Sequence, residues 1–224
     1  MRRHAATIVV LALLIGTAVA FAETERLKLE ATPIEESFVQ PAFSPACGCA
    51  TSKAAIRVRL HRADTVTVRI LNAQGETIAV PVAGQHLPSG RSTLEWDGRD
   101  SSGATAPDGF YHVEVRLARA GRTFRLPRQI ALDTVPPRAR LVSYKARLRP
   151  GQRVRVVYRV SEPAHGVLFV NGKRVAVTYT KSRRARLQWQ PKGPGRYRLQ
   201  LAGLDLAGNL GPRTPVFVVR VTSV

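Results

Sequence analysis

The chain has 224 residues, of which 44% are hydrophobic, and it carries a formal net charge of +20. These values place it in the ordinary globular class, outside the disordered and fibrous classes, and a chain of this length buries one large core or two small ones. Short β-branched runs punctuated by Gly, Pro and Asn recur along it, and helical periodicity is almost confined to the N-terminus. The sequence therefore predicts an all-β protein of two tandem antiparallel β-sandwiches after an N-terminal signal or anchor helix.

Residues 1–22 are typical of an export signal. A basic start precedes an uncharged, mainly apolar run from Ala5 to Ala22, and Ala20-Phe21-Ala22 has small residues at the spacing of a cleavage site. The run is also just long enough for a marginal membrane span. A cleaved signal peptide and an uncleaved signal anchor in the cytoplasmic membrane therefore both stay open. Either one predicts an extracytoplasmic protein.

Residues 23–43 are expected to form a polar stalk between this segment and the first domain. The stretch contains five acidic residues and little apolar pattern, a composition that favours extended, solvated chain over a packed element. Its predicted role is spacing.

Two cysteines, Cys47 and Cys49, flank a glycine just before the first predicted strand of the first domain. Thiols of an exported chain are expected to pair, but cysteines this close in sequence form a tight ring with poor disulfide geometry. An edge staple or two idle thiols, intermolecular pairing, and a redox role stay open. A metal site is disfavoured because two thiolates leave a tetrahedral site half empty, so no metal or other cofactor is predicted.

Residues 44–135 are predicted to form the first sandwich. Apolar and polar residues alternate in Ile56-Arg57-Val58-Arg59-Leu60, and Asn72-Ala73-Gln74-Gly75 has the composition of a hairpin turn. Trp96 and Tyr111 are expected in the core, because an aromatic ring on an inward face buries a large area. The prolines of Asp133–Pro137 predict a stiff, extended linker at the domain boundary.

A strand, a turn-rich loop and a second strand follow one another around Trp96. The stretch Trp96-Asp97-Gly98-Arg99-Asp100, with the later Pro107-Asp108-Gly109-Phe110-Tyr111, resembles the FlgD-type Ig-like domain of flagellar hook-capping proteins. The resemblance extends over about residues 52–132. It implies an Ig-like or fibronectin-like sandwich, and it names neither a partner nor a pathway.

Three carboxylates of this loop, Asp97, Asp100 and Asp108, have two interpretations. Hard cations such as Ca²⁺ take several oxygen ligands from acidic loops, but the spacing here is not that of a helix-loop-helix calcium motif. Tight turns also require Asp and Gly, so turn chemistry is favoured over a calcium site.

Residues 136–224 are predicted to form the second sandwich. Val154, Val156 and Tyr158 alternate with polar residues, and Asn171-Gly172 is a strong hairpin signal. The stretch Leu204-Asp205-Leu206-Ala207-Gly208-Asn209 resembles the Asp-x-Ala-Gly-Asn stretch near the end of many bacterial Ig-like repeats. The resemblance implies that this domain is Ig-like too.

Most of the positive charge lies in the second domain. Residues 138–224 contain fifteen Arg and four Lys against two acids, Glu162 and Asp205, a net charge of +17. Strand alternation places several arginines opposite the apolar faces of their strands, where they are predicted to form a basic sheet face. A solvated surface without a ligand is the alternative. The candidate binding residues are Arg153, Arg155, Arg159, Arg184, Arg186, Arg196 and Arg198.

Catalysis has little support in the sequence. The histidines are scattered, and no serine occupies a Gly-x-Ser-x-Gly elbow. The prediction is a non-enzymatic, secreted or membrane-anchored cell-envelope protein with a structural role among other envelope proteins. The alternative is a module that captures an anionic wall polymer or lipid headgroup through its arginines. Export removes the chromosome from reach, so no specific nucleic-acid partner is expected.

Overall fold

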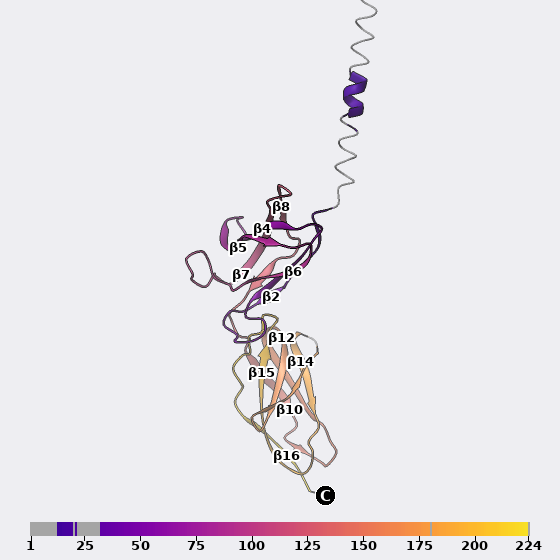
Figure 1. The fold of residues 1–224 in the computed structure, drawn as a ribbon. Helices are drawn as coiled ribbons and strands as arrows, with labels where there is room; N and C mark the ends of the chain where they lie inside the picture. The colour runs from indigo at the N-terminus through magenta and orange to yellow at the C-terminus, as the bar shows by residue number, and fades with distance from the viewer. Residues whose placement is uncertain (1–12, 20, 22–31, 180, 224) are drawn as a thin grey trace, which may run out of the picture.

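The computed structural model describes residues 13–19, 21, 32–179 and 181–223. It contains two β-sandwiches arranged end to end, with the C-terminus at the far end of the second (Figure 1). Residues 13–19 are helical, whereas most of the predicted export segment and residues 23–31 of the predicted stalk lie outside the described residues. Within the described part of the chain, no helix is both long and apolar enough to cross a membrane.

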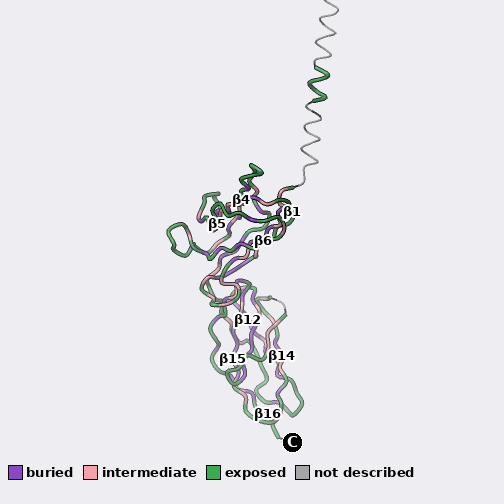
Figure 2. The backbone as a smooth tube through the Cα atoms, viewed as in Figure 1, coloured by how far each residue is buried: buried purple, intermediate pink, exposed green. Residues whose placement is uncertain are grey.

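The first sandwich packs a three-stranded sheet against a six-stranded one. The smaller sheet has the order β1 (Ile34–Val39), β3 (Ala54–Leu60) and β6 (Gly90–Trp96). The larger sheet has the order β2 (Ala42–Phe43), β9 (Ile130–Leu132), β7 (Gly109–Leu117), β4 (Asp64–Leu71) and β5 (Thr77–Leu87), and β8 (Arg122–Arg125) also pairs with β7. The alternation predicted for these strands is visible as alternating burial (Figure 2).

The aromatic residues predicted for this core are buried. Trp96 is 1% exposed and Tyr111 is 5% exposed. The Trp96 ring lies 5.2 Å from the ring of Phe43 and 5.0 Å, edge-on, from that of Tyr111. Its indole Nε1 donates a hydrogen bond of 2.9 Å to the Arg99 carbonyl, so the one polar atom of the ring is satisfied inside the core.

Residues 34–43 belong to the first sandwich, so the prediction of a stalk over residues 23–43 was wrong for this part. β1 pairs antiparallel with β3, and both Val39 and Phe43 are buried in the core. No sequence pattern indicated this, because β1 is an edge strand in which four successive residues, 35–38, are exposed. Such a strand lacks the alternation by which a half-buried strand is recognised.

The second sandwich is also built from two sheets, and one long strand, β12 (Val154–Val170), contributes to both. Its first half, residues 154–160, lies between β10 (Ala139–Tyr144) and β14 (Ser182–Trp189). Its second half, residues 165–170, pairs with β13 (Lys173–Val177) and β15 (Gly195–Leu204), beyond which lie β16 (Phe217–Val221) and β11 (Arg147–Leu148). Inward residues of both sheets form one core that includes Val156, Tyr158, Leu187, Leu199 and Val219.

Two short motifs singled out in the sequence meet at the junction between the domains. Cys47 and Cys49 form a disulfide with each other, and this loop lies against the Asp205–Asn209 turn of the second domain. The hydroxyl of Thr51 donates a 2.6 Å hydrogen bond to the carbonyl of Ala207. The Asn209 side chain donates one of 2.8 Å to the carbonyl of Asp133.

The backbone of the second domain also approaches the first domain closely at this junction. Gly208 has a φ of +99°, and a Cβ added there would overlap Thr51 and Cys49 of the first domain. The segment Asp133–Pro137 is free of regular structure, and Pro137 is buried against Gly203 and Gly211. The linker therefore packs against the second domain, and the two sandwiches are joined by direct contacts as well as by the chain.

Candidate anion-binding surface

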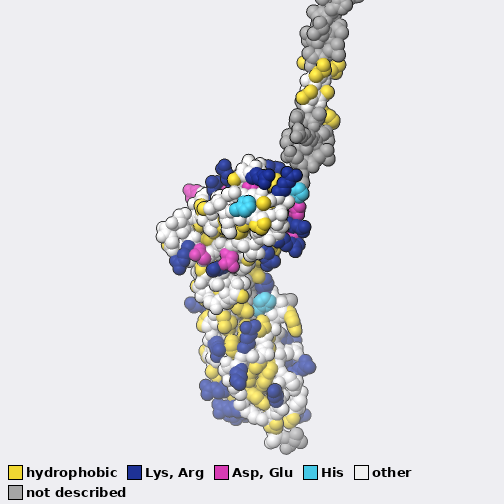
Figure 3. Space-filling model, viewed as in Figure 1, with side chains coloured by type: hydrophobic (Ala, Val, Ile, Leu, Met, Phe, Trp, Pro, Cys, Tyr) yellow, Lys and Arg dark blue, Asp and Glu magenta, His cyan; other side chains and the backbone are white. Residues whose placement is uncertain are grey.

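The two domains differ in how their surface charges are arranged. In the first domain, several strand arginines have carboxylate partners: for example, Arg59 lies 2.8 Å from Glu35, and Arg91 lies 3.0 Å from Glu36. In the described part of the second domain, no arginine or lysine forms an ion pair. On the face shown in Figure 3, the second domain displays Lys and Arg but no Asp or Glu, whereas the first displays both.

One basic row crosses the sheet of β10, β12 and β14. Arg140 pairs with Arg159 across one strand boundary, and Arg159 pairs with Arg184 across the next. All three side chains are exposed. Neighbouring strands are about 4.8 Å apart, so the row extends over about 10 Å from one edge of this sheet to the other. Three positive charges placed directly opposite one another concentrate positive potential on this face, although they also repel one another.

Two further candidate residues lie beside this row. Arg186 is opposite Val157, and Arg155 is opposite Gln188, on the same outer face of β12 and β14. An open depression of about 370 Å³ lies over Val157, Arg184 and Arg186. Four of the seven arginines predicted from sequence therefore share one face, namely Arg155, Arg159, Arg184 and Arg186.

The other two strand arginines lie on the opposite face of the sandwich. Arg196 and Arg198 are on β15, whose neighbours are β16 and the second half of β12. Arg196 pairs with Arg220, and Arg220 pairs with Arg147, so a second row of three arginines crosses β15, β16 and β11. Strand alternation predicts whether a side chain points inward or outward, but it does not predict to which of the two sheets the strand belongs. The prediction of a single basic face was therefore wrong: the arginines form two faces, one on each sheet.

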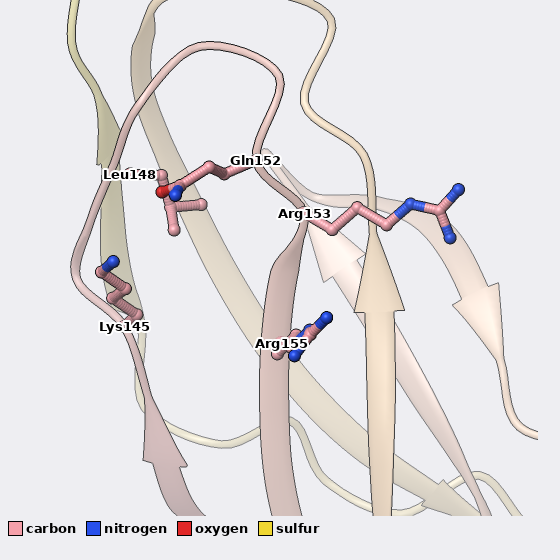
Figure 4. Close-up of a pocket in the computed structure, with 5 residues that line it drawn as sticks. All are labelled: Lys145, Leu148, Gln152, Arg153 and Arg155. Carbon is pink, nitrogen blue, oxygen red and sulfur yellow. The ribbon is translucent and has the colours of Figure 1, made fainter.

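The seventh candidate, Arg153, precedes β12 at the end of the domain. It lines an open pocket of about 360 Å³ together with Lys145, Leu148, Gln152 and Arg155 (Figure 4). The view shows the Arg153 guanidinium extending away from Lys145. Arg153 thus flanks the first face rather than belonging to its row.

Three row members were missed by the sequence analysis: Arg140, Arg147 and Arg220. A signal was present for Arg220, which stands between the buried Val219 and Val221. Arg140 is in a strand whose alternation is broken by a bulge between Leu141 and Ser143. β11, which holds Arg147, has only two residues and shows no pattern.

The two acids of the second domain both lie toward the junction, and neither forms an ion pair with a described arginine of the rows. Asp205 is 7% exposed and accepts hydrogen bonds from the backbone of Gly208 and Asn209. Burial raises the pKa of Glu162, and the nearby charges of Asp133 and Asp205 raise it further. Burial likewise raises the pKa of Asp133.

Two of the three loop carboxylates of the first domain, Asp97 and Asp100, serve turn geometry, whereas Asp108 holds a segment that is distant in sequence. Asp100 accepts hydrogen bonds from the backbone and hydroxyl of Ser102 and from the backbone of Ala104, and the Ser102 hydroxyl lowers its pKa most. Asp97 accepts from the backbone of Arg99, and Asp108 accepts from Thr134. Among the described residues, no group of three or more His, Cys, Asp or Glu is placed to hold a metal ion.

The comparisons with known proteins bear on the first domain. Residues 46–121 match the family model of the FlgD Ig-like domain. This match confirms the resemblance predicted from the Trp96 and Tyr111 segments. The basal-body rod modification protein FlgD of Salmonella typhimurium is 32% identical over 87 residues. That alignment is 38% of this chain and 37% of the relative, so the chain matches little more than a third of that relative's length.

Two of the solved structures that resemble the chain are named for fibronectin modules or FN domains. The fibronectin(III)-like modules of Clostridium thermocellum CbhA cover 84% of this chain and 91% of their own, at 12% identity and a TM-score of 0.47. The FN1–FN3 domains of chicken CNTN1 cover 87% and 70%, at 13% identity and a TM-score of 0.46. At such identities the likeness concerns the fold alone, and the strand pairing already gives that fold as two successive sandwiches.

Proposed function

We propose that this chain is a non-enzymatic, exported protein of the cell envelope whose tandem Ig-like domains have a structural, scaffold role. The observation that carries this proposal is the junction at which Thr51 and Cys49 of the first domain contact the Ala207–Gly208 turn of the second. Direct contacts of this kind hold two sandwiches in one elongated body, as a spacer requires. The match to the FlgD Ig-like domain supports a place in the envelope.

Cell fractionation combined with mass measurement tests the export step. A secreted form should begin at Glu23, whereas a membrane-associated form that retains residues 1–22 identifies an anchor. A soluble cytoplasmic product with the complete N-terminus would refute export.

Small-angle scattering of the purified chain tests the scaffold step. The expected profile is that of one elongated particle with a fixed domain arrangement. A broad ensemble of domain orientations would contradict a rigid spacer.

A second candidate function is capture of an anionic envelope polymer or headgroup by the second domain. The row of Arg140, Arg159 and Arg184, without a carboxylate partner, favours it. A guanidinium donates two parallel hydrogen bonds to a phosphate, and exposed rows of such groups attract polyanions in a salt-dependent manner.

Charge reversal tests this capture. Replacement of Arg153, Arg155, Arg184, Arg186, Arg196 and Arg198 with Glu should abolish retention on phosphate-rich wall polymer or anionic vesicles at low ionic strength. A matched control reverses six exposed arginines of the first domain, namely Arg62, Arg116, Arg119, Arg122, Arg125 and Arg128. If both variants lose retention equally, net charge alone explains the binding. If the wild-type protein is not retained at all, the second domain does not capture an anionic polymer or headgroup.

A further inference from the structure

The second domain presents basic rows on both of its opposite faces. One row consists of Arg140, Arg159 and Arg184 on the outer face of β10, β12 and β14. The other consists of Arg196, Arg220 and Arg147 on the outer face of β15, β16 and β11. The shared core lies between the two sheets, so the rows point away from each other.

We infer that the second domain is bivalent: each row binds a segment of a linear phosphodiester polymer, and one domain thereby cross-links two polymer segments. This inference rests on the second candidate function and deepens it. It assigns the ligand as an extended chain with repeated phosphate groups, and it assigns the domain a cross-linking activity.

The shape of each row favours an extended chain over a single small anion. Each row is three strands wide, so the Cα atoms of its arginines extend over about 10 Å, and Arg155 and Arg186 widen the first face along its strands. A single phosphate reaches one or two of these arginines, whereas successive phosphates of a polymer reach all of them. The first row runs across its whole sheet, so a polymer can enter at the β10 edge and leave at the β14 edge.

The placement of the rows favours a polymer over a membrane surface. A planar bilayer contacts one face of a flat sandwich and leaves the other in water. Rows on two opposite faces can both be occupied only by ligands that pass on either side of the domain. The acids are placed consistently with this, because Glu162 and Asp205 lie at the junction end and do not neutralise either row.

The experiment measures binding and cross-linking separately, with poly(glycerol phosphate) of uniform length as the probe and the full chain as the protein. Fluorescence anisotropy of labelled polymer reports binding, and light scattering reports cross-linking. Wild-type protein should raise the scattering to a maximum at an intermediate protein-to-polymer ratio and lower it again at excess protein, as bivalent cross-linkers do.

Two row variants isolate the two faces. One carries Arg140→Gln, Arg159→Gln and Arg184→Gln, and the other carries Arg147→Gln, Arg196→Gln and Arg220→Gln. Each should still bind the polymer through its intact row but lose the scattering maximum, and the variant with all six changes should lose binding as well. Circular dichroism and thermal unfolding should match the wild type, because these exposed side chains lie outside the core.

A third variant removes the same charge outside the rows. Arg138→Gln, Arg149→Gln and Arg174→Gln change three exposed arginines of the same domain and should keep the scattering maximum. Cross-linking that persists in both single-row variants, or that is lost equally in this control, would overturn bivalency.

The remaining outcomes separate this inference from the function on which it rests. Loss of all binding in one single-row variant would identify a monovalent site, which leaves anion capture intact but overturns bivalency. If the protein aggregates phosphatidylglycerol vesicles but has no effect on the polymer, its ligand is a membrane surface, and the assignment of a phosphodiester polymer as the ligand is overturned. Wild-type protein that binds neither probe would overturn both proposals.

Discussion

The two sandwiches place arginines on their outer sheet faces by the same strand alternation, yet among the described residues only the first domain pairs any of these arginines with a carboxylate. Glu35 and Glu36 of the edge strand β1 pair with Arg59 and Arg91 of the next two strands. The corresponding sheet of the second domain places Arg140, Arg159 and Arg184 side by side. A local sequence pattern therefore determines that an arginine faces solvent, but the neighbouring strand determines whether that charge is free.

The cores give the largest expected contrast. Trp96→Ala should lower the free energy of unfolding of the first domain by about 3–5 kcal/mol, since the ring is almost fully buried between Phe43 and Tyr111. Trp189→Ala should cost the second domain less, because Trp189 is only half-buried against Tyr197. Urea unfolding followed by circular dichroism measures both costs.

Each domain contains one tryptophan, so the remaining one reports on the other domain. In the Trp96→Ala protein, the fluorescence of Trp189 should change at the wild-type urea concentration if the sandwiches unfold as separate units. A shift of that transition together with the first would show that the junction couples them. A cost of under about 1 kcal/mol for Trp96→Ala would contradict its role as a core anchor.

The junction gives the next contrast, through two glycines of the second domain with similar backbone geometry. Gly208 and Gly172 have φ of +99° and +82°, so an alanine at either site costs about 1–3 kcal/mol in backbone strain. At Gly172 nothing lies within 4 Å of the added Cβ, whereas at Gly208 the Cβ would overlap Thr51 and Cys49 of the first domain.

Gly208→Ala should therefore loosen the domain arrangement, and Gly172→Ala should not. Small-angle scattering should show a broader range of particle sizes for Gly208→Ala, and limited proteolysis should cut more rapidly near residues 133–140. If both variants keep the wild-type scattering profile, the contacts around Gly208 do not hold the domains in place.

Strand alternation was sufficient to predict the inward residues of the first half of β12. Val154, Val156 and Tyr158 are buried as expected, because a period of two is enforced by the pleat. The same rule does not specify a partner sheet, and β12 crosses from one sheet to the other within a single strand. This crossing is the physical reason that Arg196 and Arg198 lie opposite Arg155 and Arg159 rather than beside them.

The junction was beyond prediction for a different reason. Cys47 and Gly208 are far apart in sequence, and each motif has an ordinary local explanation as a turn. β5 was hard to predict as well, since three irregularities in its pairing with β4 leave Val80 43% exposed although it is apolar. The FlgD-type segment was the easiest to identify, because Trp96 and its loop combine a buried ring with short-range hydrogen bonds, such as those from Trp96 to Arg99 and from Arg99 to Asp97.

A smaller effect on stability and on anion binding is expected when the two paired carboxylates of β1 are removed from the first domain. Glu35→Gln with Glu36→Gln leaves Arg59 and Arg91 without carboxylates and makes this face resemble the second domain. The stability cost should be small, as for other exposed ion pairs, because solvent screens the attraction. Retention of the protein on poly(glycerol phosphate) should persist to higher salt than for the wild type. Glu25→Gln with Glu30→Gln changes the net charge equally and serves as the control; an equal gain there would show that net charge alone is responsible.

The smallest expected effect is on the pH dependence of stability, and the carboxyl groups of Glu35 in the first domain and Glu162 in the second contribute to it with opposite signs. The hydrogen bond from His61 and the charge of Arg59 lower the pKa of Glu35, so its contribution to stability is present above its ordinary pKa of 4.5 and lost as the pH falls through the lowered value. Burial and the charges of Asp133 and Asp205 raise the pKa of Glu162. The folded protein then binds this proton more tightly than the unfolded chain, so the contribution of Glu162 to stability is fully present below its ordinary pKa of 4.5 and is lost as the pH rises through the raised value. At neutral pH, Glu162→Gln should therefore stabilise the protein by up to about 0.5 kcal/mol, whereas Glu35→Gln should destabilise it. Urea midpoints measured at several pH values decide the matter, and a destabilising Glu162→Gln at neutral pH would show that this carboxylate has a favourable partner at the junction.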